Sequence, residues 1–132
     1  MEIEPPQKIK VVDVDVKGMG VVATQNIKNG ETIEVCPIVF ISKKEAGFFE
    51  KEKTPLNFYY LQLDDYHDKV CLMLGYGSLY NHSSNPNAEI IYDEESTERV
   101  VYFKALKDIM AGEEIVYDYD FDNNIVEFLK QK

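Results

Sequence analysis

Short apolar runs with a period of two, broken by turns that contain glycine, mark the first part of the sequence. Residues 9–16 are rich in valine, residues 20–24 follow, and an Asn-Gly pair at 29–30 precedes residues 32–35. Such alternation is typical of strands, and Asn-Gly is a strong signal for a tight hairpin turn. We therefore predict β-structure here, with a bulge or a change of face where the apolar phase slips at Val11 and Val12.

The second half of the sequence has the same character. Strand-like runs cover residues 70–74, 88–92, 99–103 and 115–119, with turn signals at 93–96 and 110–112. These runs predict a mainly β protein of the α+β class.

Helix signals are few and local. Ser42 and Glu45 have the spacing of a capping box, which predicts a short helix from that point. Thr54 and Pro55 are expected to open the next element, and residues 123–130 could form an amphipathic helix capped by Asn123.

Length and composition indicate one folded domain. The 132 residues fit a single domain, and 45% hydrophobic residues are enough for a core, which argues against intrinsic disorder. The net charge of −10 repels phosphate backbones and attracts basic polypeptides, although acidity could also serve solubility alone. We expect one domain over residues 1–132 and no direct binding of nucleic acid.

Cysteine and histidine usage bounds the redox and metal chemistry. Cys36 and Cys71 lie in apolar strand-like runs, where a free thiol behaves as a small buried hydrophobe. The sequence has no Cys-x-x-Cys pair, and its histidines are His67 and His82, so no zinc-site spacing exists and we expect no metal. Residues 1–6 do not resemble a signal peptide and no apolar run is long enough to span a bilayer. The expected location is the cytoplasm, or the nucleus if the source is eukaryotic or viral.

Two glycines one residue apart, Gly18 and Gly20, flank Met19 near the start of the chain. Glycine lets the backbone pass close to a ligand because no side chain intervenes. Alone this pattern is weak, since a Gly-x-Gly between strands is more often only a turn.

The segment 75–88 is dense in amide, hydroxyl and imidazole groups and directly follows an apolar strand. Such groups either satisfy the backbone of an irregular loop or bind the polar edges of a ligand. His82 has no histidine or cysteine nearby to share a metal ion, and Ser83 lacks the glycine-flanked turn of a serine nucleophile.

The third segment is Gly-Glu-Glu-Ile-Val-Tyr-Asp-Tyr-Asp at residues 112–120. In a strand, alternation places Tyr117 and Tyr119 on one face and Asp118 on the other. Two phenols on one face can frame a narrow slot, although single tyrosines in strands are usually core residues.

Together and in this order, the three segments resemble the SET-domain family. The resemblance rests on the Gly-x-Gly, on the Asn-His-Ser…Pro-Asn loop at 81–87 and on the late Tyr-Asp-Tyr run, and it extends over about residues 9–119. It implies a mainly β fold of the β-clip type, with several small curved sheets, a pseudoknot and one or two short helices. It leaves residues 120–132 as a C-terminal tail.

The resemblance also implies an activity, namely transfer of a methyl group from S-adenosylmethionine to a lysine side chain of a basic protein such as a histone. Tyr119 matches the catalytic tyrosine. Tyr117 matches a position linked to the number of methyl groups transferred, where tyrosine favours monomethylation. The residues implied to contact the cofactor are Gly18, Met19, Gly20, Asn81, His82 and, on a looser match, Tyr60, with Tyr76 a weaker candidate.

The chain departs from many family members in lacking cysteine-rich zinc segments. Ser84 stands where a cysteine is common and Ser78 where many members have arginine. What closes the lysine channel is therefore open, and either residues 121–132 or a second subunit would have to supply it. The alternatives to an enzyme are an inactive SET-like module that binds a peptide or cofactor, and an acidic β-rich adaptor with no small-molecule site.

Overall fold

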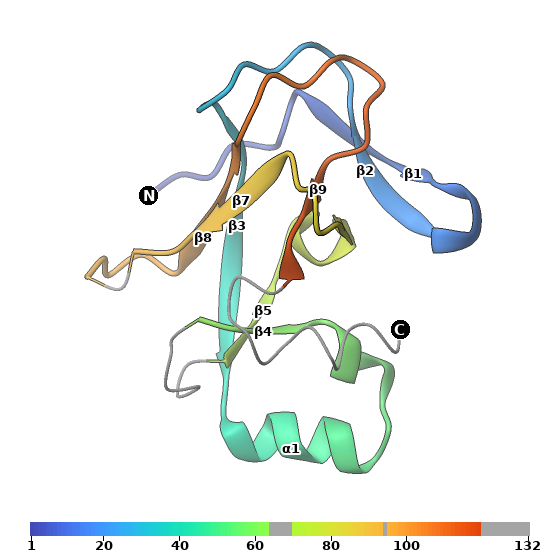
Figure 1. Ribbon diagram of the computed structural model, residues 1–132. Helices are drawn as coiled ribbons and strands as arrows, with labels where there is room; N and C mark the ends of the chain where they lie inside the picture. The colour runs from blue at the N-terminus through green and yellow to red at the C-terminus, as the bar shows by residue number, and fades with distance from the viewer. Residues whose placement is uncertain (64–69, 94, 120–132) are drawn as a thin grey trace.

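The computed structural model describes residues 1–63, 70–93 and 95–119 of the chain (Figure 1). This part of the chain is built mainly from short strands, with one α-helix and three 3-10 turns. In chain order the elements are β1 (Ile9–Asp13), η1 (Asp15–Lys17), β2 (Met19–Ala23), β3 (Thr32–Ile41), α1 (Lys43–Lys51), η2 (Pro55–Phe58), β4 (Tyr60–Gln62), β5 (Val70–Met73), η3 (Gly77–Leu79), β6 (Asn81–His82), β7 (Ala88–Ile91), β8 (Val100–Ala105) and β9 (Val116–Tyr117).

Strands β1 and β2 form a separate antiparallel hairpin, which lies at the opposite end of the molecule from α1 in Figure 1. The pairing runs without interruption from Ile9↔Ala23 to Asp13↔Met19, so of the two alternatives predicted at Val11–Val12 the bulge is wrong. Strand β1 also stops before residue 16, because Asp15 adopts a left-handed conformation (φ 48°) at the start of η1.

Strand β3 is shared between two small sheets. Its first half, from Thr32 to Pro37, pairs with β8, and its second half, from Ile38 to Ile41, pairs with β5. The register shifts between Thr32 and Glu34, which marks a β-bulge in this strand. Apart from the β1–β2 hairpin, the strand order is β4-β5-β3-β8-β7-β9-β6. The expected set of small sheets is therefore confirmed, with β3 as the strand that connects two of them.

The turn at Asn29–Gly30 does not form the predicted hairpin. Gly30 does adopt a left-handed conformation (φ 86°), but β2 pairs with β1 and β3 pairs with β5 and β8. The turn instead contacts β8, because the Gly30 N–H donates to the carbonyl of Ala105. Long-range pairing has overridden a local turn signal.

Helix α1 begins at the predicted capping box. The Ser42 hydroxyl accepts from the Glu45 backbone N–H and the Glu45 carboxylate accepts from the Ser42 backbone N–H. Thr54 and Pro55 open η2, a 3-10 turn. No helix in the described ranges is long and apolar enough to cross a membrane. The predicted helix at 123–130 lies outside the described residues, and the division into a core of 9–119 and a tail stays a prediction.

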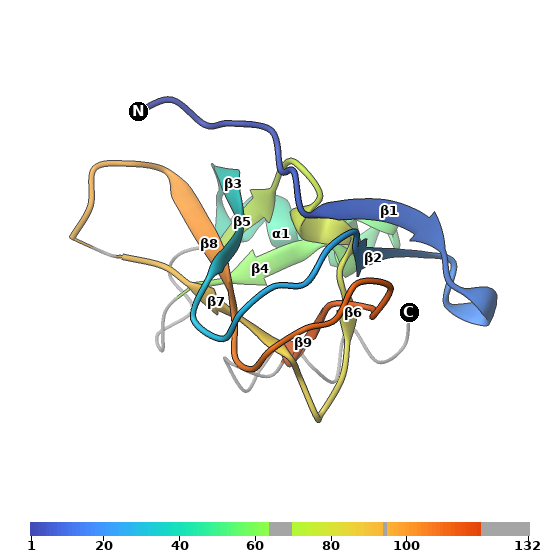
Figure 2. The same cartoon turned by 90° about the horizontal axis from the view of Figure 1, so that it is seen from above.

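Strand β9 lies between β6 and β7, two strands that are consecutive in the sequence (Figure 2). It pairs in parallel with both, through Asn81↔Val116 and His82↔Tyr117 on one side and Ala88↔Tyr117 on the other. The late segment therefore passes between two strands joined by only a short connection. Chain connections rarely thread in this way, and this is the pseudoknot that the resemblance implied. Pairing reaches only Val116–Tyr117, so the run 115–119 is a shorter strand than predicted.

The core is formed by inward-facing residues of these sheets. Cys36 and Cys71 are both buried and free, as expected. The remaining predicted strands at 70–74, 88–92 and 99–103 are confirmed as β5, β7 and β8 within one or two residues. The largest fully buried side chains include Tyr80, Phe103, Ile27, Leu61, Ile109 and Ile115.

Candidate functional site

The two glycines of the Gly-x-Gly segment are required for different reasons. Gly18 has φ 81° and ψ −134°, a conformation that residues with side chains rarely adopt. Gly20 lies in β2, and a Cβ atom there would come within 2.7 Å of Glu114 Oε2 and 2.8 Å of Asn81 Nδ2. The second glycine therefore allows two polar side chains from later in the sequence to reach the backbone of β2.

Asn81 links the Gly-x-Gly segment to the late strand. Its Nδ2 donates to the backbone carbonyl of Met19 (3.1 Å) and to Glu114 Oε2 (2.7 Å). Both partners are acceptors, so the orientation of the Asn81 amide is fixed. All three motifs that the sequence singled out thus meet at one side chain.

His82 holds the backbone just after β9, at Tyr119. Its Nδ1 accepts from the backbone N–H of Tyr119 at 3.0 Å, which requires this nitrogen to be unprotonated and leaves Nε2 as the donor in the neutral ring. The imidazole also lies against the Tyr119 ring, with centroids 5.1 Å apart and the ring planes tilted by 50°. Asp118 Oδ1 is 3.7 Å from Nδ1, which is too far for a hydrogen bond.

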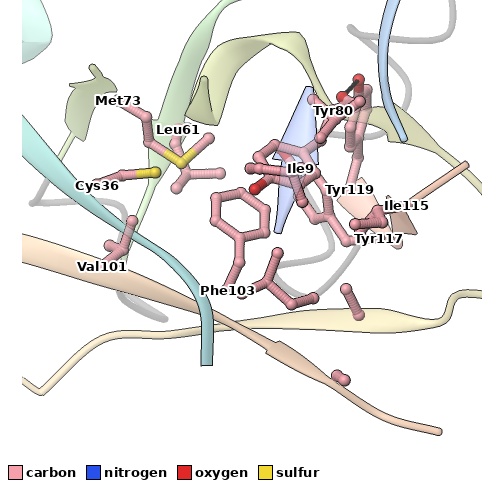
Figure 3. Packing of buried hydrophobic residues seen from close by; sticks show 14 of the residues in the cluster. Ile9, Cys36, Leu61, Met73, Tyr80, Val101, Phe103, Ile115, Tyr117 and Tyr119 are labelled. Atoms are coloured by element: carbon pink, nitrogen blue, oxygen red, sulfur yellow. Dashed lines mark hydrogen bonds between the residues drawn. The ribbon is translucent and has the colours of Figure 1, made fainter. Parts of the chain in front are cut away.

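Four aromatic rings surround the end of β9, as Figure 3 shows for Tyr80, Phe103, Tyr117 and Tyr119. The Tyr117 and Tyr119 rings are 4.8 Å apart at 54°, so they share one face as alternation predicted. Tyr80 stacks on Phe103 at 3.9 Å, and Phe103 meets Tyr117 edge to face at 5.3 Å. The Tyr119 hydroxyl donates to the carbonyl oxygen of Tyr80 at 2.6 Å.

Burial keeps these phenols neutral. It is the main cause that raises the pKa of Tyr119 to about 12, with smaller contributions from Tyr59 and Glu114. Burial likewise raises the pKa of Tyr117 and Tyr80 well above the ordinary value, and Glu34 adds to the effect at Tyr80. At neutral pH the site therefore presents uncharged hydroxyls that can donate and accept hydrogen bonds, and no phenolate base.

The two looser candidates, Tyr60 and Tyr76, have different surroundings. The pKa of Tyr60 is raised first by burial and then by Glu50 of helix α1, while its neighbour Tyr59 contributes to the raised pKa of Tyr119. The backbone N–H of Tyr76 donates to a buried carboxylate, that of Glu34. A cofactor role for Tyr60 stays a prediction, and its neighbour Tyr59 has an electrostatic link to Tyr119.

Three polar residues of this region were given no role from the sequence. Asn87 is buried and holds β9 by donating to the Glu114 carbonyl and accepting from the Val116 N–H, both at 2.9 Å. The Glu114 carboxylate accepts a hydrogen bond from the Asn81 amide. Glu34 is buried beneath Tyr80. The sequence did carry one signal for the burial of Glu34. Residues 34, 36 and 38 lie on the same face of strand β3, which Cys36 and Ile38 mark as the buried face.

The geometry brings Gly20 against Asn81, and the adjacent His82 against Tyr119. The SET domain family model matches residues 18–120. The chain belongs to the SET-domain family. Within the described part of this SET domain, no group of three or more His, Cys, Asp or Glu side chains could hold a metal ion.

Relatives of this SET domain are named lysine methyltransferases. It is 29% identical over 113 residues to "Histone-lysine N-methyltransferase, H3 lysine-37 specific" of Schizosaccharomyces pombe, covering 84% of this chain and 72% of the relative. It is 30% identical over 114 residues to N-lysine methyltransferase KMT5A-B of Xenopus laevis, covering 78% of this chain but only 33% of that protein.

A solved structure supports the fold. The crystal structure of a Plasmodium falciparum protein described as a candidate histone methyltransferase superposes with a TM-score of 0.64 and 31% sequence identity. The match covers 92% of this chain and 98% of the other. The mainly β fold with curled sheets is therefore that of a SET domain.

Proposed function

We propose that this SET domain transfers a methyl group from S-adenosylmethionine to a lysine side chain of a basic protein. The observation that carries the proposal is the continuous network joining the three motifs. Asn81 bonds both the Met19 carbonyl and Glu114, while the adjacent His82 bonds the Tyr119 backbone. One site can thus contain both the groups suited to a cofactor and the tyrosines suited to a lysine.

The residues around the Gly-x-Gly segment fit the amino acid portion of the cofactor. Both bonds donated by Asn81 leave through Nδ2, so its Oδ1 is the atom that can accept from a ligand ammonium group. The backbone at Gly18 is open, since a Cβ atom there would meet nothing within 4 Å. In the neutral His82 ring, Nε2 can donate to an acceptor of the adenine portion. When bound, the cofactor supplies an electrophilic methyl group on a sulfonium.

The tyrosines fit a lysine side chain that must lose its proton before it can act as a nucleophile. A lysine with its ordinary pKa of about 10.4 is neutral in only about one part in a thousand at pH 7, a cost of roughly 4 kcal/mol. Uncharged, water-excluding phenols favour the neutral amine. Because the pKa of Tyr119 is raised to about 12 and that of Tyr117 is also raised, both remain uncharged.

The Tyr119 hydroxyl has a defined orientation for this task. Its proton is directed to the Tyr80 carbonyl, so its oxygen lone pairs are the part that can accept from the amine. If an amine N–H points to that oxygen, the nitrogen lone pair points away from Tyr119, where it can face the methyl group of the cofactor. Positioning of this kind, more than acid or base strength, is what an in-line displacement requires.

Charge supports a basic protein substrate. The net charge of −10 attracts lysine-rich and arginine-rich chains, and Glu114 and Asp118 lie partly exposed beside Asn81 and His82. These carboxylates would steer a cationic lysine toward the site, while the buried phenols favour its neutral form. Since the S. pombe relative is named for histone H3, a histone-like protein is the substrate class to test first.

Calorimetry and labelled transfer test the proposal in turn. We expect S-adenosylmethionine and its demethylated product to bind the wild-type protein and to bind Asn81→Ala more weakly, whereas Asn29→Ala removes an amide in an exposed turn and should bind normally. Absence of binding would leave only an adaptor. Labelled cofactor incubated with a panel of basic proteins then separates an enzyme, which transfers label to lysine, from an inactive binding module.

A further inference from the structure

Glu34 is a buried carboxylate held by neutral donors. Only 4% of the surface of Glu34 is exposed to solvent. Oε1 accepts from the Tyr80 hydroxyl at 2.8 Å and Oε2 accepts from the Tyr76 backbone N–H at 2.9 Å. Among the residues that the structure describes, no Lys, Arg or His forms an ion pair with it. A buried carboxylate is costly unless it is bonded, so these two donors, together with the Cys36 thiol that also hydrogen-bonds Glu34, determine how it is held.

The loop before β6 is shaped to approach this carboxylate. Gly75 adopts a left-handed conformation (φ 64°), and a Cβ atom there would lie 2.6 Å from Glu34 Oε2. Gly77 packs about as closely, since a Cβ atom on it would lie 2.7 Å from Met73 Cβ and 3.1 Å from Cys36 Sγ. Glu34 therefore fastens both ends of the segment 76–80, at the Tyr76 backbone and at the Tyr80 side chain.

Tyr80 connects Glu34 to Tyr119. Its hydroxyl is bonded to Glu34, its ring stacks on Phe103 at 3.9 Å and lies edge to face with Tyr117 at 6.5 Å, and its carbonyl accepts from the Tyr119 hydroxyl at 2.6 Å (Figure 3). The ring and the carbonyl belong to one residue. A displacement of the ring would therefore also move the acceptor that orients Tyr119.

We propose that Glu34 is a positioning residue, which holds the Tyr80 ring so that the Tyr80 carbonyl orients the Tyr119 hydroxyl. Glu34 acts on the Tyr119 hydroxyl through Tyr80, and its bond to the Tyr76 backbone N–H holds the other end of the same loop. Its effect on methyl transfer rests on the proposed function, but its effect on the Tyr119 hydroxyl does not.

The test uses two variants and a core control. Tyr80→Phe removes the hydroxyl that bonds Glu34 and keeps the ring that stacks on Phe103. Glu34→Gln keeps one acceptor but presents an amide N–H₂ toward one of the two donors. Ile109→Val removes one methyl from a fully buried residue outside this chain of contacts, and it controls for loss of core packing.

The first readout is steady-state methyl transfer. We expect kcat to fall about tenfold or more in both variants, as a misplaced reacting group does, with little change in the KM for the cofactor. Ile109→Val should keep both values. The two changes should be less than additive in the double variant, because both break the bond between Glu34 and the Tyr80 hydroxyl.

The second readout needs no activity. In tyrosine labelled with ¹³C at Cζ, a slowly exchanging hydroxyl gives two signals in mixed H₂O and D₂O, and we expect this for Tyr119 in the wild type and in Ile109→Val. Faster exchange, seen as one averaged signal, is expected in Tyr80→Phe and Glu34→Gln. Unchanged exchange in both variants, or unchanged kcat in both, overturns the inference. If the wild type transfers no label, the proposed function fails and the exchange result alone decides the role of Glu34.

Discussion

The hydroxyl of Tyr119 donates a 2.6 Å hydrogen bond to the backbone carbonyl of Tyr80, a residue 39 positions earlier in the chain. The pseudoknot makes this contact, because it places β9 beside β6, the strand that directly follows Tyr80. The bond fixes where the phenol proton points, toward the Tyr80 carbonyl. The threaded topology thus determines the orientation of the Tyr119 hydroxyl.

Gly20→Ala should weaken cofactor binding. The new methyl group would lie 2.7 Å from Glu114 Oε2 and 2.8 Å from Asn81 Nδ2, so the Asn81 amide must shift. We expect about tenfold weaker binding by calorimetry and a stability loss of about 1–3 kcal/mol.

Gly47→Ala is the matched control for this change. Gly47 lies in helix α1, and a Cβ atom there meets nothing within 4 Å. Alanine at this position should stabilise the helix by up to about 1 kcal/mol and leave cofactor binding unchanged. Equal binding by Gly20→Ala and Gly47→Ala would contradict the placement of the cofactor beside Asn81.

Tyr117→Phe should change the degree of methylation. Tyr117 is buried against Tyr119 and Phe103, so loss of its hydroxyl enlarges the space beside Tyr119 where we propose that lysine binds. We predict that the wild type stops at monomethyl-lysine and that the variant adds further methyl groups, measured by mass spectrometry of the modified lysine. An unchanged product would remove the monomethylation proposal without affecting the assignment of Tyr119.

Stability should fall in alkaline solution. Burial raises the pKa of Cys71 to about 12 and that of Tyr119 to about 12, and it raises the pKa of Cys36 and Tyr117 as well. In the unfolded chain these groups ionise from about 8.5 for thiols and about 10 for phenols. Since the folded state holds the protons longer, the stabilisation is complete below about pH 8 and is lost as pH rises toward 12.

Urea unfolding followed by circular dichroism at several pH values measures this effect. We expect a free energy of unfolding at pH 11 that is lower than at pH 7 by on the order of 3 kcal/mol or more. Cys71→Ala should have a shallower decline, because one titrating group has been removed. A flat profile up to pH 11 would mean that the thiols and phenols are not buried as described.

Local signals were sufficient for the elements that depend on neighbouring residues. The Ser42–Glu45 capping box predicted the start of helix α1, and alternation predicted that Tyr117 and Tyr119 share a face. The same reasoning failed at Asn29–Gly30, where the flanking strands pair with distant partners. A turn signal specifies a change of direction but cannot specify which strands the chain joins.

The candidate site was predicted as a set of motifs, but its connections were not. Nothing local indicates that Asn81 bonds Glu114 or that Glu34 bonds Tyr80, since each pair is far apart in the sequence. Asn87, Glu114 and Glu34 form hydrogen bonds within the pseudoknot and the loop before it, and these features exist only in the folded chain. Pairing of this kind is a tertiary property and needs the structure.

The most direct measurement of the central claim is transfer of a deuterated methyl group from labelled S-adenosylmethionine to a histone mixture, followed by tandem mass spectrometry. We predict label on a lysine side chain with the wild type and at least about 100-fold less with Tyr119→Phe, in which the oriented hydroxyl is absent although the ring remains. Equal transfer by both proteins, or label on residues other than lysine, would contradict the account.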